Sequence, residues 1–337
     1  TNTANAAIAF GYEQTDTYLH VAPMFHLADA GNTWTVTLAG GTHAFIPGFT
    51  PDGTLKAIQD FKITKIVLVP TMINMVVNHP DVNKYDLSSL KSVLYGASPI
   101  PAAVLKKAME TLCSCDFVQG YGMTESSQVV SILSAENHRL PEDHEHYGRL
   151  KSAGHALPLA EIEVRDDNDE EVAHGTVGEI CFRGANVMKG YLNMPEATEE
   201  ALKGGWMHSG DVGYMDDDGY IYLVDRSKDM IVTGGENVYS VEVEAAIYTH
   251  PAVLEAAVIG IPNKEWGEAV HAVVKLKEGE SATEEELIAH SKTLIAGFKC
   301  PKSIEFSEED LPKSGAGKIL KRDLRVKHWG DAERGIN

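Results

Sequence analysis

Residues 119–125, with the sequence QGYGMTE, combine side-chain types that suit a nucleotide. Two glycines let the backbone approach a ligand closely, and the tyrosine offers a flat face to a base. Thr124 supplies a hydroxyl for a phosphate, and Glu125 supplies a carboxylate for a divalent cation. Because a Gly-Tyr-Gly segment alone is more often an ordinary turn, this pattern needs support from other segments.

A second segment of small residues, YGASPIP at 95–101, follows an expected strand. Residues 119–125 also follow a strand. The ends of neighbouring parallel strands line the crevice in which open α/β sheets bind ligands. The two segments together therefore predict one ligand-binding edge.

Three further segments place polar residues beside glycines or in charged runs. In GWMHSGDVG at 205–213, Asp211 lies in a glycine-flanked turn and could hold ribose hydroxyls, although such an aspartate is more often a hairpin-turn residue. The charged run at 225–229 is typical of a solvated linker, and TGGEN at 233–237 is typical of a flexible loop.

A glycine-rich loop, PKSGAGKI, spans residues 312–319. Lys318 could stabilise the negative charge that develops at a phosphorus centre, and the common alternative is an exposed lysine in a flexible loop. This loop is not a Walker phosphate loop, which needs a glycine five positions before its Gly-Lys glycine and Ser or Thr after the lysine. The chain has Pro312 and Ile319 at those places.

Strand and helix patterns alternate up to about Arg149, which is typical of a doubly wound sheet. The run at 65–69 is apolar and rich in β-branched residues, so we expect a buried parallel strand there. The expected strands are 18–22, 43–46, 65–69, 92–95 and 116–118, and the expected helices are 29–38, 51–61, 71–77 and 101–112.

The pattern becomes richer in strands after Arg149, with an Asp-Gly hairpin turn at 218–219 and a solvated acidic loop at 166–171. A small α+β unit follows from residue 225, and its second helix opens with a capping box at Thr283. The expected strands here are 161–165, 178–183, 213–215, 220–224, 253–260 and 269–275, and the expected helices are 241–248 and 283–294.

Composition narrows the class of protein. The 337 residues correspond to about two domains. The net charge of −20 disfavours nucleic acid as a partner, because a phosphate backbone would be repelled. Cysteines at 113, 115, 181 and 300 show no CxxC spacing, which fits a reducing compartment. No apolar run is long enough to span a membrane, and residues 1–5 do not resemble a signal peptide.

The order of these segments resembles the adenylate-forming superfamily of acyl-CoA synthetases, luciferases and peptide-synthetase adenylation domains. The resemblance covers essentially the whole chain. It rests on PMFH at 23–26, VPT at 69–71, the segment from Tyr95, YGMTE at 121–125, GEI at 178–180, SGD at 209–211, DR at 225–226 and GK at 317–318.

The resemblance implies an α/β fold in which part of the large adenylate-forming domain, a doubly wound sheet plus a β-rich subdomain, precedes a small α+β C-terminal lid. Residues 1–227 would be the C-terminal portion of the large AMP-binding domain, and residues 228–337 would be the lid. Lys228 would be the hinge between them.

The resemblance also implies roles for the matching residues. Thr124, Glu125 and Lys318 would be catalytic, with Glu125 holding Mg²⁺ and Lys318 stabilising the adenylation transition state. The nucleotide would lie against Gly96, Ala97, Ser98, Gln119, Gly120, Tyr121, Gly122, Thr124, Asp211 and Arg226, the acid against His26, Gly120 and Gly122, and the coenzyme A arm against Gly234, Gly235 and Glu236.

The implied activity is that of an acid–thiol ligase. A carboxylic acid would attack ATP to give an acyl-AMP and pyrophosphate, and coenzyme A would then displace AMP. The GGEN run at 234–237 resembles that of fatty-acyl and bacterial aryl-CoA ligases, so we expect a fatty or hydroxycinnamic acid such as ferulate. We also expect a cytoplasmic location and no nucleic-acid partner, and leave a homodimer open.

The family's phosphate loop, rich in Ser, Thr and Gly, precedes the PMFH segment in other members and is not found in these residues. We therefore expect the 337-residue chain alone to be impaired in adenylation, and the preceding segment could come from a separate chain. Robust ATP–pyrophosphate exchange by this chain alone would contradict that expectation.

Three alternatives remain at this stage. One is a non-catalytic nucleotide-binding remnant. Another is a serine hydrolase, for which Ser88 and Lys91 fit an S-x-x-K pattern, although no GxSxG occurs. The last is a metal site at His138, His144 and His146, for which surface exposure is the preferred explanation because no HExxH spacing is present.

Overall fold

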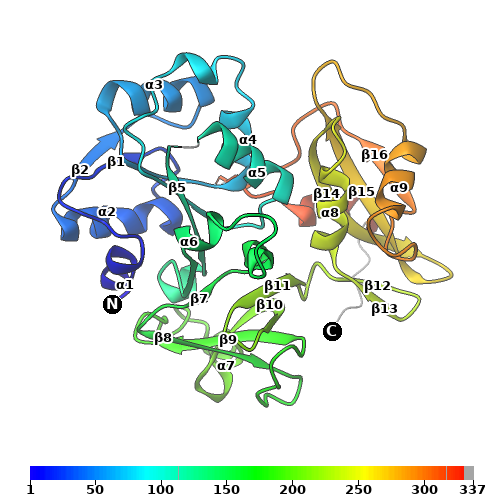
Figure 1. Ribbon diagram of the computed structural model, residues 1–337. Helices are drawn as coiled ribbons and strands as arrows, with labels where there is room; N and C mark the ends of the chain where they lie inside the picture. The colour runs from blue at the N-terminus through cyan, green and yellow to red at the C-terminus, as the bar shows by residue number, and fades with distance from the viewer. Residues whose placement is uncertain (113, 316, 330–337) are drawn as a thin grey trace. The chain divides into compact units, whose positions relative to one another are not determined.

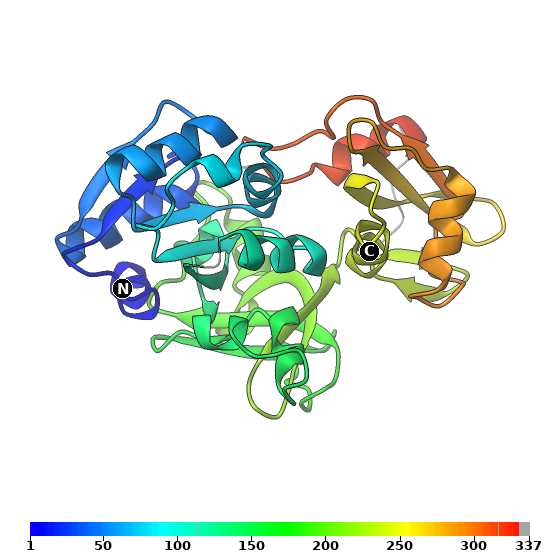
Figure 2. The same ribbon diagram turned by 45° about the horizontal axis from the view of Figure 1, so that its top comes forward.

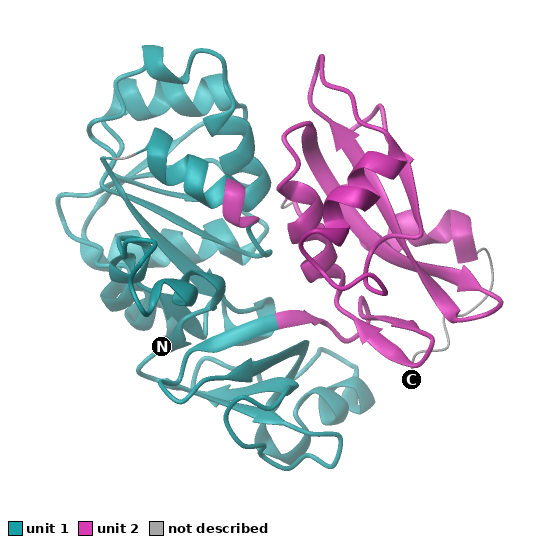
Figure 3. Cartoon of the chain, turned by 45° about the vertical axis from the view of Figure 1, so that its right-hand side comes forward, with its two compact units in different colours: residues 1–100, 104–223 teal, residues 101–103, 224–337 magenta. Residues whose placement is uncertain are grey.

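The computed structural model describes residues 1–112, 114–315 and 317–329, so Cys113 and Ala316 lie outside the described residues. The chain forms two compact units (Figure 3). Unit 1 comprises residues 1–100 and 104–223, and unit 2 comprises residues 101–103 and 224–337. The units divide at Leu223 and Val224, and a hinge at Lys228 stays a prediction.

A seven-stranded sheet forms the centre of unit 1 (Figure 1), with the strand order β2-β1-β3-β4-β5-β6-β7. The first five strands in this order are parallel, and β6 and β7 run antiparallel to their neighbours. The strands are β1 (Thr17–His20), β2 (Thr42–Phe45), β3 (Lys65–Leu68), β4 (Ser92–Gly96), β5 (Asp116–Tyr121), β6 (Ser131–Leu133) and β7 (His155–Ala156).

Side chains alternate between two cores along the central strands, which confirms the doubly wound architecture. Ile66 and Leu68 of β3 lie in one core, and Val67 lies in the other. All four residues of β3 are buried, as expected for a parallel strand covered on both faces. The first core contains residues of α3 (Pro51–Phe61), α4 (Pro70–Val77) and α5 (Ala102–Thr111), and the second contains residues of α1 (Asn2–Ala9) and α2 (Leu27–Ala39).

A four-stranded antiparallel sheet, ordered β11-β10-β9-β8, follows in the chain. Its strands are β8 (Ala160–Arg165), β9 (Gly178–Gly184), β10 (Met207–Met215) and β11 (Ile221–Arg226), with the helix α7 (Pro195–Ala201) between β9 and β10. The expected Asp-Gly hairpin turn joins β10 to β11, where Gly219 has a φ of 80° and its N–H donates to Asp216 O.

Unit 2 has a sheet with helices on both faces (Figure 2, α9 in orange and α10 in red). Ala256 and Val258 of one strand face a core shared with α8 and α9, whereas Ala257 and Ile259 face Leu324 of α10. The elements are β12 (Ile231–Thr233), β13 (Glu236–Val238), α8 (Ser240–Tyr248), β14 (Val253–Asn263), β15 (Gly267–Leu276), α9 (Glu284–Lys292), β16 (Ser303–Phe306) and α10 (Lys321–Trp329).

Short elements complete the fold: α6 (Ala135–His138) and four 3-10 turns, which are η1 (Val82–Lys84), η2 (Thr124–Ser126), η3 (Tyr147–Lys151) and η4 (Lys203–Gly205). The expected capping box of α9 is confirmed, because Thr283 and Glu286 exchange backbone-to-side-chain hydrogen bonds. None of the helices in the part of the chain that the structure describes has the length and apolar composition needed to cross a membrane.

Two expectations about the motifs are wrong. Residues 119–121 belong to β5 and not to a turn, because they pair with both β4 and β6. Asp211 does not lie in a hairpin turn, because residues 207–215 form one strand with an irregularity in its middle. In both segments a glycine, Gly120 in β5 and Gly210 in β10, lies inside a strand, where sequence patterns predict turns.

Candidate functional site

The ends of β4 and β5 bring the two small-residue segments together, as expected. Gly96 pairs with Gly120 across the two strands. A Cβ atom on Gly96 would lie 2.2 Å from Gly120 O, and one on Gly122 would lie 2.3 Å from Gln128 O. These two glycines are therefore required where the chain packs against itself, and their expected places beside a nucleotide stay predictions.

Ala97 and Ser98 follow β4 directly, and Ala97 adopts a left-handed backbone with a φ of 67°. A non-glycine residue in this region of backbone space is uncommon and is often found at functional sites. Ala97 is exposed and Ser98 is half-buried. Both come directly after Gly96, which pairs with Gly120 near the end of β5.

Asp211 meets Tyr121 at this edge, and the Tyr121 hydroxyl donates to Asp211 Oδ2 at 2.8 Å. The two residues are 90 positions apart in the chain. A hydroxyl-bearing ring and a carboxylate side by side match the two parts of a nucleoside, a flat base and a pair of ribose hydroxyls. This pair joins the first and third motif segments into one site.

A wide bulge in β10 presents Asp211. His208 pairs with Cys181 and Val212 pairs with Glu179, so three residues of β10 stand opposite Ile180 alone. Such bulges re-aim side chains beside functional sites. Ser209 closes the bulge, because its hydroxyl donates to Ile180 O at 2.6 Å and accepts from the Asp211 N–H at 3.0 Å.

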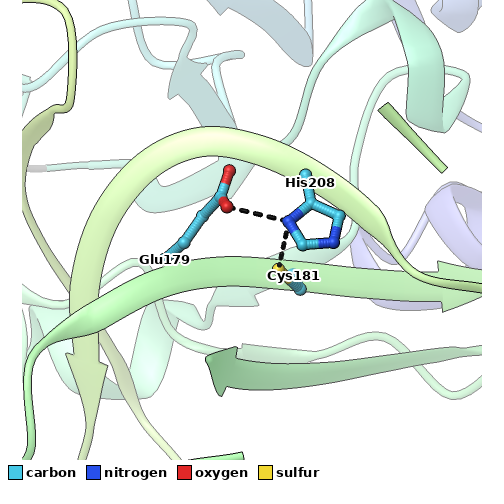
Figure 4. Close-up of side chains that lie close together, drawn as sticks. All are labelled: Glu179, Cys181 and His208. Atoms are coloured by element: carbon cyan, nitrogen blue, oxygen red, sulfur yellow. Dashed lines mark hydrogen bonds and ion pairs between the residues drawn. The ribbon is translucent and has the colours of Figure 1, made fainter. Parts of the chain in front are cut away.

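The carboxylate of Glu179 braces the same bulge. Its Oε1 accepts from the Gly210 N–H at 2.8 Å, and its Oε2 lies 2.8 Å from His208 Nδ1 (Figure 4). Cys181 Sγ lies 3.5 Å from the same ring nitrogen, and Asp169 Oδ1 lies 3.4 Å from His208 Nε2. Burial raises the pKa of the Cys181 thiol to about 12. Glu179 therefore holds the loop that carries Asp211.

Thr124 and Glu125 belong to η2, a single 3-10 turn just after β5. Thr124 is exposed, and the Tyr191 hydroxyl donates to Glu125 Oε1 at 2.8 Å. Burial, together with the neighbouring carboxylate, raises the pKa of Tyr191 to about 12. Tyr191 orients Glu125 and was missed by the sequence analysis, since no local pattern links residues 66 positions apart.

His26 begins α2, because its Nδ1 accepts from the Ala28 N–H at 3.1 Å. The amide of Gln128 donates to Ala28 O at 3.3 Å, and a Cβ on Gly31 would lie 2.4 Å from Gln128 Oε1. The first turn of α2 therefore packs against the segment that follows Glu125, which brings His26 to the neighbourhood of the site.

The remaining candidates belong to unit 2. Gly234 and Gly235 form the two-residue connection between β12 and β13, and their φ values of 61° and 85° are those of a type I′ hairpin turn. Arg226, Lys228 and Glu236 are exposed. The roles expected for these residues beside a nucleotide and the coenzyme A arm stay predictions.

Lys318 stands in a closed loop. The Ser314 N–H donates to Lys318 O at 2.8 Å, and the Lys318 N–H donates to Ser314 Oγ at 3.2 Å. Lys313 and Ile319 form an isolated antiparallel β-bridge. The loop is thus held at its base by backbone pairing. Its Gly317 has a φ of 82°, a conformation that glycine adopts readily.

The charged run at 225–229 is not a solvated linker. Asp225 is 5% exposed, and both its oxygens accept from the first residue of α8, Ser240. Burial raises the pKa of Asp225, and Lys321 opposes that shift. Lys321 also pairs with Glu244 at 2.8 Å, and Arg325 pairs with Asp229. These groups tie the start of unit 2 to α8 and α10.

The rival sites receive no support. Ser88 Oγ donates to Asp86 Oδ1 at 2.6 Å, whereas Lys91 pairs with Asp16 at 3.4 Å, so the two residues of the S-x-x-K pattern have different partners. His138 is 6% exposed, which corrects the expectation that it lies on the surface with its neighbours in sequence. It is hydrogen-bonded to Tyr95 at 2.8 Å.

Comparison with known proteins identifies the family. Residues 1–192 match the family model of the AMP-binding enzymes, and residues 242–318 match that of the AMP-binding enzyme C-terminal domain. The chain therefore belongs to the AMP-binding enzyme family, whose large α/β domain and smaller C-terminal domain it carries.

Relatives of this chain include ligases for several acids. A feruloyl-CoA synthase from an Amycolatopsis species is 40% identical over 326 residues, which are 96% of this chain and 64% of that protein. The fatty acid–[acyl-carrier-protein] ligase ScoC from Streptomyces coeruleorubidus is 37% identical over 94% of this chain and 59% of its own length. The chain thus spans about three fifths of the length of these relatives.

Solved structures agree with this assignment. The ATP-bound structure of MatB from Rhodopseudomonas palustris has a TM-score of 0.88 and 29% identity, covering 98% of this chain and 64% of its own. The amide bond synthetase McbA from Marinactinospora thermotolerans has a TM-score of 0.87 and 33% identity, covering 97% of this chain and 64% of its own. The expected adenylate-forming fold is confirmed.

Proposed function

We propose that this chain carries the nucleotide-binding edge and the lid of an ATP-dependent acid–thiol ligase. The observation that supports this most is the Tyr121–Asp211 pair, in which the Tyr121 hydroxyl lies 2.8 Å from Asp211 Oδ2. Tyr121 ends β5, and Asp211 lies on the bulge that Glu179 braces. In this proposal Asp211 accepts hydrogen bonds from the ribose hydroxyls, and Tyr121 orients that carboxylate. Adenine lies between the segments around Ala97 and Gly120.

The other candidates follow from this placement. Thr124, exposed on η2, donates to a phosphate, and Glu125 holds Mg²⁺ through Oε2 while Tyr191 occupies Oε1. A half-buried carboxylate held by one hydroxyl fits a hard cation, which prefers oxygen ligands. Arg226 reaches the ribose and phosphate side, and Lys318 stabilises the charge that develops on the α-phosphate.

The reaction has two steps. A carboxylate oxygen of the acid attacks the α-phosphorus of ATP, the bond to the β-phosphate oxygen breaks, and an acyl-AMP and pyrophosphate result. The thiolate of coenzyme A then attacks the acyl carbon, and AMP leaves. The lid, residues 228–337, turns about Lys228 between the steps and replaces Lys318 by the Gly234–Gly235 hairpin and Glu236, which line the coenzyme A arm.

We further propose a fatty or hydroxycinnamic acid as the substrate, with His26 and residues near Gly120 and Gly122 beside the acyl group. The relatives named feruloyl-CoA synthase and medium/long-chain-fatty-acid–CoA ligase support these two classes. Octanoate and ferulate, each supplied with ATP, Mg²⁺ and coenzyme A to the chain together with the phosphate-loop segment, separate them by the rate of AMP formation. Equal rates with both acids and with acetate would contradict a selective pocket.

Calorimetric titration of the chain with AMP tests the nucleotide site without requiring the complete reaction. We expect the wild-type chain to bind AMP, and Asp211→Asn to weaken binding about tenfold or more, because a carboxylate that accepts two hydroxyls loses its charge. Asp217→Asn is the matched control, since the Asp217 side chain is fully exposed at the hairpin turn of the same sheet. Equal AMP affinity in wild type and Asp211→Asn would overturn the assignment.

ATP–pyrophosphate exchange with the acid tests the first chemical step. With the preceding segment that carries the family's phosphate loop supplied, we expect Lys318→Ala to lower the rate of exchange about a hundredfold or more while leaving AMP binding within about twofold of the wild type. This combination separates a transition-state role from a binding role, since an interaction made only in the transition state does not affect the bound product. A homodimer, the separate chain and a cytoplasmic location stay predictions.

A further inference from the structure

The geometry of unit 2 points to a binding site for a borderline divalent metal ion such as Zn²⁺, built by His271, Glu305 and His328. One ligand atom from each of the three side chains lies within 4.8 Å of the others. The site belongs to no motif of the proposed ligase reaction and is independent of it. Two imidazoles and one carboxylate form a donor set that zinc and its neighbours in the first transition row prefer.

The sheet and one helix place the three donors on a single face. His271 is in the middle of β15, and its partner residue on the parallel strand β16 is Ser303. Glu305 lies two residues further along β16 and therefore points to the same face as Ser303. His328 comes from the last turn of α10, whose Leu324 packs on that face of the sheet.

Two buried ring nitrogens are the observation that favours a ligand. Among the described residues, neither His271 Nε2 nor His328 Nε2 has a hydrogen-bond partner, although both atoms are buried. The side chain of His271 is only 7% exposed. A buried polar atom without a partner costs free energy, and native proteins usually satisfy it. A metal ion between the two rings would satisfy both nitrogens at once.

The arrangement already meets the secondary requirements of a metal site. His271 Nδ1 lies 2.7 Å from Ser303 Oγ, which fixes the ring and leaves Nε2 as the inward-facing atom. His271 Nε2 is 3.9 Å from Glu305 Oε2, and tetrahedral zinc separates its ligand atoms by about 3.4 Å.

The charged neighbours of the site decide which oxygen of Glu305 is available to a metal ion. Lys327 pairs with Glu305 Oε1 and leaves Oε2 as the oxygen that faces His271. Glu284, the first residue of α9, accepts a hydrogen bond from the Ile304 N–H of β16 at 3.0 Å. Glu305 is 40% exposed, so an ion can enter from its side and keep a water as fourth ligand. Trp329 anchors this end of α10 through a 2.9 Å hydrogen bond to Gly260 O.

Competition with a chromophoric zinc chelator tests the proposal on the chain without a histidine tag. We expect the wild type to bind about one equivalent of Zn²⁺, and His271→Gln and His328→Gln each to weaken binding about a hundredfold or more. His290→Gln is the matched control, since His290 also faces a second histidine in unit 2 but bonds to Thr249 at 2.6 Å.

Cobalt gives a second readout. Co²⁺ bound by two nitrogens, one carboxylate and water in a tetrahedral site gives visible absorption bands, which we expect in the wild type and in His290→Gln but not in His328→Gln. His328 is only half-buried on the last turn of a helix, so its variant keeps the test decisive if His271→Gln fails to fold. Absence of Zn²⁺ binding by the wild type, or binding that both variants retain, overturns the proposal.

Discussion

His138 in unit 1 and His271 in unit 2 are both buried histidines, at 6% and 5% exposure. They differ in the hydrogen-bond partners of their ring nitrogens. The Tyr95 hydroxyl lies 2.8 Å from His138 Nε2, and Ser134 O lies 2.9 Å from Nδ1, so both nitrogens are satisfied by the chain. His271 has Ser303 on Nδ1, whereas in the described part of the chain its Nε2 has no hydrogen-bond partner and lies 3.9 Å from a carboxylate oxygen of Glu305.

This contrast separates a structural histidine from a candidate ligand. Burial lowers the pKa of both rings to about 4, so the pKa does not distinguish them. What distinguishes them is the set of atoms around the second nitrogen. His208 stands between the two cases, because carboxylates flank both of its nitrogens and one of them, Glu179, is committed to the Asp211 bulge.

The largest effect that we expect is the acid sensitivity conferred by His138. In the unfolded protein the His138 ring has a pKa near 6.5, whereas in the folded protein burial lowers this pKa to about 4. Between these pH values the unfolded state binds more protons, so the free energy of unfolding falls as the pH falls from 6.5 to 4. The loss contributed by this residue is about 3 kcal/mol.

Urea unfolding of the wild type and His138→Gln at pH 7 and pH 4.5 measures this effect. We expect the variant to lose less stability on acidification than the wild type. His146→Gln is the control, since 41% of the His146 side chain is exposed. Identical pH dependence in wild type and His138→Gln would break the comparison, because the ring would then not be buried and neutral in solution.

Removing the partner of His138 is expected to have the next largest effect. Tyr95→Phe leaves His138 Nε2 buried without a hydrogen-bond partner and costs about 2 kcal/mol of unfolding free energy. Urea unfolding at pH 7 measures the loss. Tyr248→Phe in unit 2 serves as a size-matched control that does not touch His138. A loss below about 0.5 kcal/mol would show that water replaces the tyrosine, and that buried histidines in this fold tolerate open nitrogens.

Glu179→Gln tests the intermediate case. The amide keeps the size of the side chain but loses the charge that faces His208 and one of the acceptors that hold the bulge. We expect AMP affinity to fall about tenfold, because Asp211 is displaced, while the protein stays folded. Glu161→Gln is the control, because Glu161 is an exposed glutamate of the adjacent strand β8 that pairs with Arg183. Unchanged AMP affinity with wild-type stability would show that the bulge holds without Glu179.

The smallest effect is expected for Ser303→Ala in unit 2. The loss of the hydroxyl that fixes His271 Nδ1 costs about 1 kcal/mol of stability. If His271 is a ligand, the same change also weakens Zn²⁺ binding about tenfold, because the ring loses its orienting partner. Chelator competition and urea unfolding on the same sample separate these two consequences. Ser307→Ala controls for the loss of a serine hydroxyl, because Ser307 is a half-buried residue directly after β16 whose hydroxyl donates to Glu309 O.

Local patterns predicted most of the fold. The helix at residues 51–61 matches α3 at both ends, because Thr50 caps it and Pro51 suits its first turn. The buried apolar run became β3. Patterns failed where glycines lie inside strands. Gly120 permits close packing and Gly210 takes a φ of 72° within the bulge, and both have the same local signature as a glycine in a turn.

The candidate residues were predicted mainly by their order along the chain, and their partners were not. Asp211 was a candidate, but its bulge and the bracing by Glu179 depend on strand register, which no local pattern encodes. Tyr191 and Lys321 were missed for the same reason, since each acts on a residue dozens of positions away. Asp225 was expected in a solvated run and is instead buried against α8.

The sequence by itself determined the alternating strands and helices, the order of the motifs and hence the family, because these depend on local periodicity and on residue types in a set order. Only the tertiary structure decided which polar atoms find partners. Long-range pairing satisfies His138 and braces Asp211. In unit 2 it brings His271, Glu305 and His328 together, and among the described residues two of their ring nitrogens have no hydrogen-bond partner. Hydrogen-bond satisfaction is a property of neighbours in space, which spacing along the chain does not specify.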